Sequence, residues 1–290
     1  MKLSYNEATS MGCPDSSLEN DVLGCAKAGF ELIELRFDKL YPYLETHSIN
    51  ELAELFQQNG VKPLTFNAVY LYQQLFTDED VPERKLEVVK AIELAAELSS
   101  VIGAKDIIVV VPLYREETAG PYVGDWETVK QDCIRILRHL SDFADKHGLR
   151  LGLETVGNFR SGVRTLEKAA EIVEAVNKYN VGYVLDAYNI FQYDKSNDFS
   201  PITKLPQDKI FAVHINNADD ADLSMISQSD RRFCDTGVIN LDAYMSAIQS
   251  TGYDGMISIE TVRPEYWQQS SDSLIKEAYL TTEKAIRSYL

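Results

Sequence analysis

Short apolar runs alternate along the chain with longer stretches of helical periodicity, at intervals of about 30 residues. Most runs are continuously apolar, as in Ile107–Val111, which is typical of parallel strands buried on both faces. The predicted strands are Lys2–Asn6, Leu32–Phe37, Lys62–Val69, Asp106–Pro112, Arg150–Thr155, Val181–Asp186, Ile210–His214 and Met256–Glu260. The predicted helices between them are Ser17–Ala28, Lys85–Ile102, Thr128–His147, Thr165–Lys178 and Leu241–Ser250.

This alternation continues without a linker or a shift in composition, so we predict an α/β fold with a single domain over residues 1–290. Eight strand–helix units fit a closed (β/α)8 TIM barrel better than an open doubly wound sheet. Glycines such as Gly29 and Gly103 stand where predicted helices end, as the left-handed conformation of a helix terminus requires. The longest non-periodic segment, residues 216–240, follows the seventh strand, and we expect it to be functional.

Four predicted strands end in residues that can bind a metal, namely Glu154, Asp186, His214 and Glu260 on strands five to eight. The carboxyl ends of barrel strands converge on one face, where TIM-barrel active sites lie. A single such residue is more often a helix cap or an ion-pair partner, but three converging carboxylates would repel one another without a cation. Three oxygen ligands and one imidazole suit one divalent metal ion, either Mn²⁺, Zn²⁺, Mg²⁺ or Co²⁺.

A metal ion held in this way can polarise a substrate carbonyl and stabilise the enediolate that forms when a proton leaves the adjacent carbon. Glu154 and Glu260 flank the predicted site from strands five and eight, so they are the candidate catalytic base and acid. The expected reactions are isomerisation or epimerisation of a keto-polyol or ketose sugar, and dehydration by β-elimination is an alternative on the same site.

Composition narrows the class of partner. A content of 45% apolar and 25% charged residues predicts a chain with a large core. The net charge of −17 argues against nucleic acids and anionic membranes, which leaves a small-molecule substrate. The sequence has neither GxGxxG after the first strand nor GxxxxGK[ST], so nothing in it supports a nucleotide site. Scattered cysteines without a secretory signal indicate reduced thiols in a cytoplasmic protein.

At the four strand ends the sequence resembles the xylose-isomerase-like TIM barrels, which include ketose 3-epimerases, inosose dehydratases and endonuclease IV. The resemblance covers nearly the whole chain and is closest to the inosose isomerase branch of inositol catabolism. Its motifs include Ile33–Arg36 and the Arg263–Tyr266 segment directly after Glu260. The resemblance implies the same four metal ligands and an isomerase of polyhydroxy ketones. It also implies a homo-oligomer as one option, because dimers and tetramers are frequent in the family.

The resemblance further places substrate-binding residues near the metal. Arg231 matches a position often used near the substrate, with a solvated surface charge as the alternative. Arg36 and Asn67 are further candidates, although Arg36 could instead support a ligand carboxylate. The family usually has a histidine where this chain has Asn189, and asparagine can bind a hydroxyl but cannot carry a proton near neutral pH. The familiar Pro-Gly of the seventh loop is replaced at Cys234-Asp235, so the substrate stays open.

Several functions therefore compete with the isomerase. A ketose 3-epimerase, or a dehydratase of an inosose or a dehydroshikimate-like ring, would use the same metal. A non-catalytic sugar-binding barrel is an alternative of another class, which Asn189 keeps open. A nuclease of the endonuclease IV kind needs three metals and further histidine ligands. We do not expect one, because His47, His139 and His147 are not placed to supply them.

Overall fold

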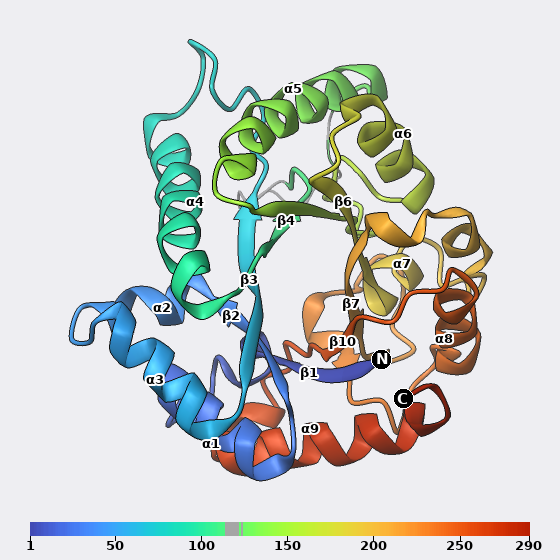
Figure 1. The fold of residues 1–290 in the computed structure, drawn as a ribbon. Coiled ribbons are helices and arrows are strands. Elements are labelled where there is room, and N and C mark those ends of the chain that lie inside the picture. The colour runs from blue at the N-terminus through green and yellow to red at the C-terminus, as the bar shows by residue number, and fades with distance from the viewer. Residues whose placement is uncertain (114–121, 123) are drawn as a thin grey trace.

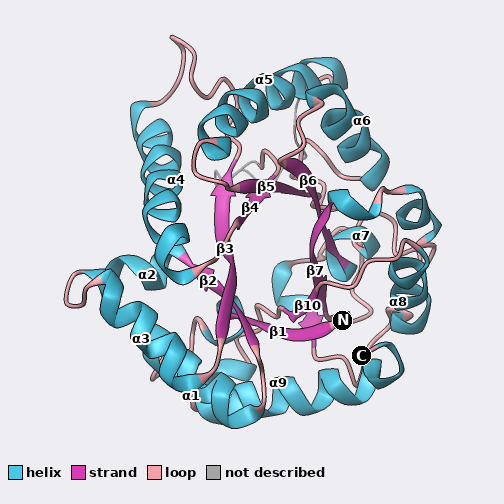
Figure 2. Cartoon of the chain, in the orientation of Figure 1, coloured by secondary structure: helices cyan, strands magenta, loops and turns pink. Residues whose placement is uncertain are grey.

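The computed structural model describes residues 1–113, 122 and 124–290. Its strands form a closed parallel barrel with helices packed around the outside (Figures 1 and 2). The barrel strands are β1 (Lys2–Asn6), β2 (Leu32–Arg36), β3 (Lys62–Tyr70), β4 (Asp106–Val110), β5 (Arg150–Glu154), β6 (Val181–Asp186), β7 (Ile210–Ile215) and β10 (Met256–Ile259). They close in the order β1-β10-β7-β6-β5-β4-β3-β2. The predicted TIM barrel is confirmed, and the strand bounds differ from the prediction by a few residues.

The register of the barrel strands brings the strand ends that carry the candidate metal ligands to one level. In the pairing of β6 with β7, Asp186 lies opposite His214, and in the pairing of β4 with β5, Val110 lies opposite Glu154. The continuously apolar runs are buried as expected, since Ile107 and Ile108 in β4 have no exposed surface. The packed barrel interior therefore supports a polar cluster at its carboxyl end.

Helices cover the outside of the barrel, and the five predicted ones are present with small shifts at their ends. The helices are α1 (Leu18–Ala28), α2 (Phe37–Leu44), α3 (Ile49–Asn59), α4 (Pro82–Ile102), α5 (Trp126–Asp145), α6 (Leu166–Val176), α7 (Ala187–Phe191), α8 (Leu241–Ser250) and α9 (Ser271–Ile286). The 3-10 helices are η1 (Glu7–Ser10), η2 (Ser200–Lys204), η3 (Gln207–Lys209), η4 (Gln228–Asp230), η5 (Tyr266–Gln268) and η6 (Arg287–Tyr289). Gly29 and Gly103 end their helices with φ angles of 106° and 82°, as predicted.

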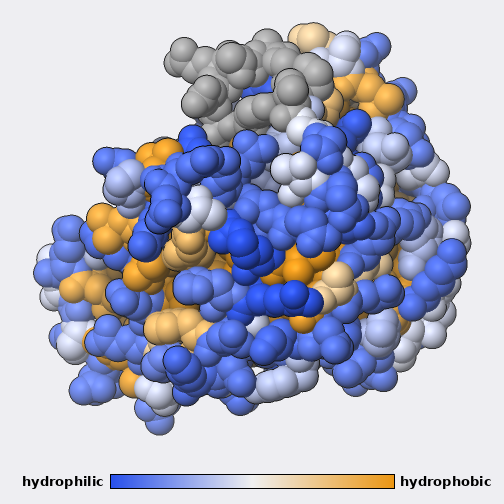
Figure 3. Space-filling model, turned by 90° about the horizontal axis from the view of Figure 1, so that it is seen from above, coloured by the Kyte–Doolittle hydropathy of each residue, from blue (hydrophilic) through white to orange (hydrophobic). Residues whose placement is uncertain are grey.

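Four helices lie outside the prediction: α2, α3, α7 and α9. Pro42 interrupts the pattern of α2, which has eight residues, and α7 has only five, so both are too short for helical periodicity to be recognised in the sequence. Within the described part of the chain, no helix combines the length and apolar character that crossing a bilayer requires. The face shown in Figure 3 is mostly hydrophilic, with apolar residues in small separate groups.

The segment after β7, residues 216–240, is called the seventh loop below. It is more regular than the sequence predicts, because β8 (Asn217–Ala218) pairs with β9 (Arg231–Arg232) in an antiparallel ribbon. Ala218 lies opposite Arg231 in this ribbon. A side chain at Gly237 would collide with Asn217, and Gly237 has a φ of 145°, so glycine is required where the loop closes on itself. The ribbon gives Arg231 a fixed position above the barrel.

Candidate metal centre

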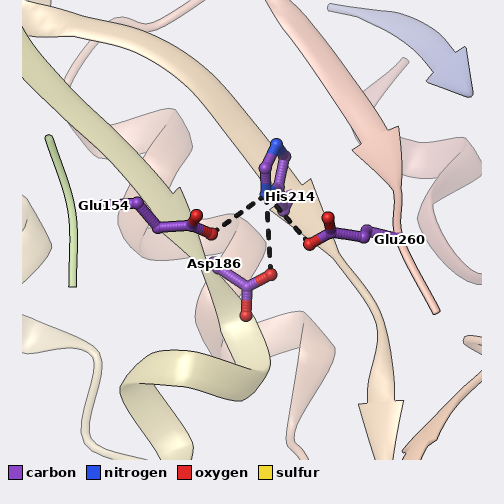
Figure 4. Close-up of side chains that lie close together, drawn as sticks. All are labelled: Glu154, Asp186, His214 and Glu260. Carbon is purple, nitrogen blue, oxygen red and sulfur yellow. Dashed lines mark hydrogen bonds and ion pairs between the residues drawn. The ribbon is translucent and has the colours of Figure 1, made fainter. Parts of the chain in front are cut away.

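Glu154, Asp186, His214 and Glu260 meet at the carboxyl end of the barrel (Figure 4). Each contributes one ligand atom, these atoms lie within 4.8 Å of one another, and all four residues are buried. The Nδ1 atom of His214 lies 3.2 Å from Glu154 Oε1, 3.3 Å from Glu260 Oε2 and 3.7 Å from Asp186 Oδ2. The structure thus brings together the four residues that the strand pattern singles out.

Glu34, in the middle of β2, contacts the other side of the His214 ring. Its Oε1 lies 3.1 Å from Nε2 of His214, and its Oε2 accepts a hydrogen bond of 2.6 Å from Thr65. A carboxylate can only accept, so Nε2 of His214 donates its proton to Glu34. Nδ1 faces the three other carboxylates, and a metal ion bound among them would take the place of a proton on Nδ1, as in the usual carboxylate–histidine–metal arrangement.

Charges in the cluster shift the pKa values of its members strongly. Burial lowers the pKa of His214, but Glu34 and Glu260 more than reverse this and raise it well above its ordinary value. Burial raises the pKa of Glu154 to about 7, against the opposing effect of His214. Burial also acts to raise the pKa of Asp186, yet Arg231 and His214 hold it below its ordinary range. The cluster is therefore a set of carboxylates that needs positive charge among them.

Arg231 supplies part of that charge. Its Nη1 lies 2.7 Å from Asp186 Oδ2 and 3.3 Å from Glu260 Oε2, and its guanidinium group stands 5.0 Å from the centre of the Tyr188 ring. Arg231 is only 2% exposed, so the alternative of a solvated surface charge is wrong. A direct contact between Arg231 and a substrate stays a prediction.

Two predicted substrate residues each donate a hydrogen bond to a carboxylate of the cluster. Asn189, in the first turn of α7, donates from Nδ2 to Glu154 Oε1 at 3.2 Å. Its backbone N–H also donates to Asp186 Oδ1 at 2.6 Å, so Asp186 caps this helix. Asn67, in the second half of β3, donates from Nδ2 to Glu260 Oε1 at 3.3 Å. Both amides therefore orient the two candidate catalytic glutamates.

Arg36 lies farther from the cluster. Its guanidinium group donates to both carboxylate oxygens of Asp38, at 2.8 and 3.0 Å. Its backbone N–H donates to Glu7 Oε2 at 2.7 Å. Among the described residues, the guanidinium group has no hydrogen bond to any of the four candidate ligands, which does not support the alternative role for Arg36. Its role as a substrate contact stays a prediction.

Three further residues of the cluster are absent from the predicted site: Glu34, Asn6 and Asn216. Asn6 donates from Nδ2 to Glu260 Oε1 at 3.0 Å. Asn216 donates to Asp186 Oδ2 at 3.2 Å and accepts at 3.0 Å from the backbone N–H of Tyr188. A charged residue inside an apolar strand was the available signal for Glu34, and the positions at strand ends were the signal for the two asparagines.

The Arg263–Tyr266 segment after β10 holds the seventh loop in place. Arg263 Nη1 donates to Asp219 Oδ2 at 2.5 Å and to the backbone oxygen of Ser229 at 3.2 Å. The ring of Tyr266 stacks on Phe233 with 4.3 Å between the centroids. These contacts join both ends of the β8–β9 ribbon to the barrel, so the segment indirectly positions Arg231.

Comparison with known proteins finds relatives over the full length of the chain. An inosose isomerase from Halalkalibacterium halodurans is 34% identical over 290 residues, which cover 100% of this chain and 98% of that protein. An inosose isomerase from Bacillus subtilis is also 34% identical, over 100% of this chain and 99% of its own. A crystal structure of the IOLI protein with a bound zinc atom superposes with a TM-score of 0.88 at 32% identity, covering 100% of this chain and 99% of the other.

The match at the level of the family covers most of the chain. The family described as xylose isomerase-like TIM barrel matches residues 23–278, which include all four residues of the cluster. The resemblance predicted from the strand ends and from the Arg263–Tyr266 segment is thereby confirmed. The chain belongs to the xylose isomerase-like TIM barrel family.

Proposed function

We propose that this protein is a divalent-metal-dependent isomerase of a keto-polyol, acting through an enediolate, with inosose as the first substrate to test. The observation that carries the proposal is the buried cluster of three carboxylates around Nδ1 of His214. The two full-length relatives named inosose isomerase support this reaction class and this substrate. We also keep the prediction of a cytoplasmic protein.

Glu154, Asp186, His214 and Glu260 would hold the ion. Their donor set fits Mn²⁺, Zn²⁺, Mg²⁺ or Co²⁺, and Glu34 accepts from Nε2 of the imidazole, which leaves Nδ1 to bind the ion. The zinc atom in the related IOLI structure supports a divalent ion without selecting one for this chain. When bound, such an ion supplies a Lewis acid that polarises the substrate carbonyl.

The protein side chains would move the protons. Glu154 and Glu260 approach from opposite sides of His214 (Figure 4), so one can remove a proton from carbon and the other can return it. Asn189 orients Glu154, while Asn6 and Asn67 orient Glu260. Arg231 offsets the negative charge of Asp186 and Glu260 during the reaction.

Product analysis tests the proposal against its closest rivals. Metal-loaded protein is incubated with inososes and with ketohexoses, and the products are identified by NMR and mass spectrometry. An isomerase gives a ketone of unchanged mass whose carbonyl has moved, whereas a 3-epimerase inverts one carbon and leaves the carbonyl in place. Loss of water would instead indicate the dehydratase. Binding of a ketone in calorimetry without any product would favour the non-catalytic barrel.

A further inference from the structure

Gln228, in η4 of the seventh loop, lies between two residues of the metal centre. Its Oε1 accepts a hydrogen bond of 2.6 Å from Arg231 Nε. Its Nε2 donates a long hydrogen bond of 3.4 Å to Asn189 Oδ1, and Asn189 donates in turn to Glu154 Oε1 at 3.2 Å. A continuous relay of side chains therefore runs from Arg231 to Glu154.

The chemistry at the two ends fixes the direction of this relay. A guanidinium group can only donate, so the oxygen of the Gln228 amide must face Arg231. An ionised carboxylate can only accept, so the nitrogen of the Asn189 amide must face Glu154. The remaining contact then joins the nitrogen of Gln228 to the oxygen of Asn189, which is the arrangement observed. Neither amide can flip without losing hydrogen bonds on both sides.

Gln228 also faces open space. It lines a cavity of about 450 Å³ between the segment after β5 and the seventh loop, together with Val156, Asn158 and Ile226. Its side-chain nitrogen has two hydrogens, and only one has an acceptor among the described residues. The second N–H is available to a hydroxyl oxygen of a molecule in the cavity. Gln228 thus connects the cavity to a candidate catalytic carboxylate.

We infer that Gln228 is a positioning and specificity-determining residue, which holds Asn189 against Glu154 and binds one hydroxyl group of the substrate. The inference rests on the proposed isomerase function and names a residue that recognises a hydroxyl group of the polyol. Asn189 cannot carry a proton near neutral pH, so its contribution is the orientation of Glu154. That orientation depends on the second contact of its amide, which Gln228 provides.

The test compares Gln228→Leu with wild type and with Gln57→Leu, an exposed glutamine on α3 that serves as the control. Using metal-loaded protein, we expect kcat/KM to fall about 10-fold to 100-fold in Gln228→Leu and to stay unchanged in the control. The metal affinity, measured by calorimetry, should stay within about 2-fold, since Gln228 contacts no candidate ligand directly. Gln228→Asn, which keeps the polarity but is one carbon shorter, should show a similar loss if the leucine variant does not fold.

Two further measurements separate positioning from a general structural effect. The losses in Gln228→Leu and Asn189→Ala should not add in the double variant, because both break one relay. Across ketones that each lack one hydroxyl group, wild type should discriminate against one of them by 10-fold or more, and Gln228→Leu should lose that discrimination. If wild type is active, additive losses, or unchanged kcat/KM and discrimination in the variants, overturn the role of Gln228 but leave the proposed isomerase function standing. An inactive wild type overturns the proposed function as well.

Discussion

Glu34 determines which nitrogen of His214 faces the metal centre. It is fully buried, lies 3.1 Å from Nε2 and is held by Thr65 and Asn6. Without it, the imidazole could carry its proton on Nδ1, where a metal ligand needs a lone pair. At the residue scale, we therefore expect the affinity for a metal ion to depend on a side chain that would not touch the ion.

Replacing Glu34 by glutamine tests this dependence. We expect Glu34→Gln to weaken divalent-metal binding about 10-fold to 100-fold, because the amide is a weaker and uncharged acceptor for the Nε2 proton. The affinity is measured by competition with a chelator. Glu31→Gln is the matched control, since Glu31 is exposed just before the same strand and pairs with Lys2. Equal affinities in both variants would show that Glu34 does not orient the ligand.

At the element scale, the strands could be predicted from sequence because burial on both faces leaves a local signature. Ile107–Val111 is apolar at every position, and such a run predicts its own burial. The places of Glu154 and Asp186 followed from the strand ends alone. The seventh loop could not be predicted in this way, because contacts between distant residues build it, such as Arg263 with Asp219.

Breaking the Arg263–Asp219 contact should loosen the seventh loop and leave the barrel intact. In Arg263→Met we expect faster hydrogen exchange in residues 217–233 and lower kcat/KM, because Asp219 and Ser229 each lose the hydrogen bond from Arg263. Exchange in β5 and β6 should not change. Arg287→Met provides the control, since Arg287 pairs with Glu283 on the exposed side of α9. Unaltered exchange in the loop would mean that Arg263 does not anchor it.

At the scale of the whole molecule, stability should depend on a buried carboxyl group outside the metal centre. Burial raises the pKa of Glu7 to about 8, although Lys39 partly opposes this effect. The unfolded chain releases that proton near the ordinary value of 4.5. Between these two values the folded state binds more protons than the unfolded state, so the free energy of unfolding falls as pH rises.

The variant Glu7→Gln removes this pH dependence of the free energy of unfolding, because the glutamine side chain is neutral in both the folded and the unfolded state. We expect Tm to fall less between pH 5.5 and 8 in this variant than in wild type. The two falls should differ by about 2–4 °C for each kcal/mol by which the Glu7 proton changes the free energy of unfolding. Melting curves are recorded with the same metal content at each pH. Glu45→Gln, at an exposed position, should follow the wild-type curve. Parallel curves for Glu7→Gln and wild type would contradict a raised pKa at Glu7.

The most direct test of the central claim is solvent exchange at the carbon next to the substrate carbonyl. Wild-type protein loaded with each of the four metals is mixed with an inosose in D2O, and deuterium incorporation is followed by NMR. We expect incorporation that is abolished by a chelator, restored by metal and reduced at least 100-fold in Glu260→Gln. Incorporation that persists in the chelated protein, or that is as fast in Glu260→Gln as in wild type, would contradict the account.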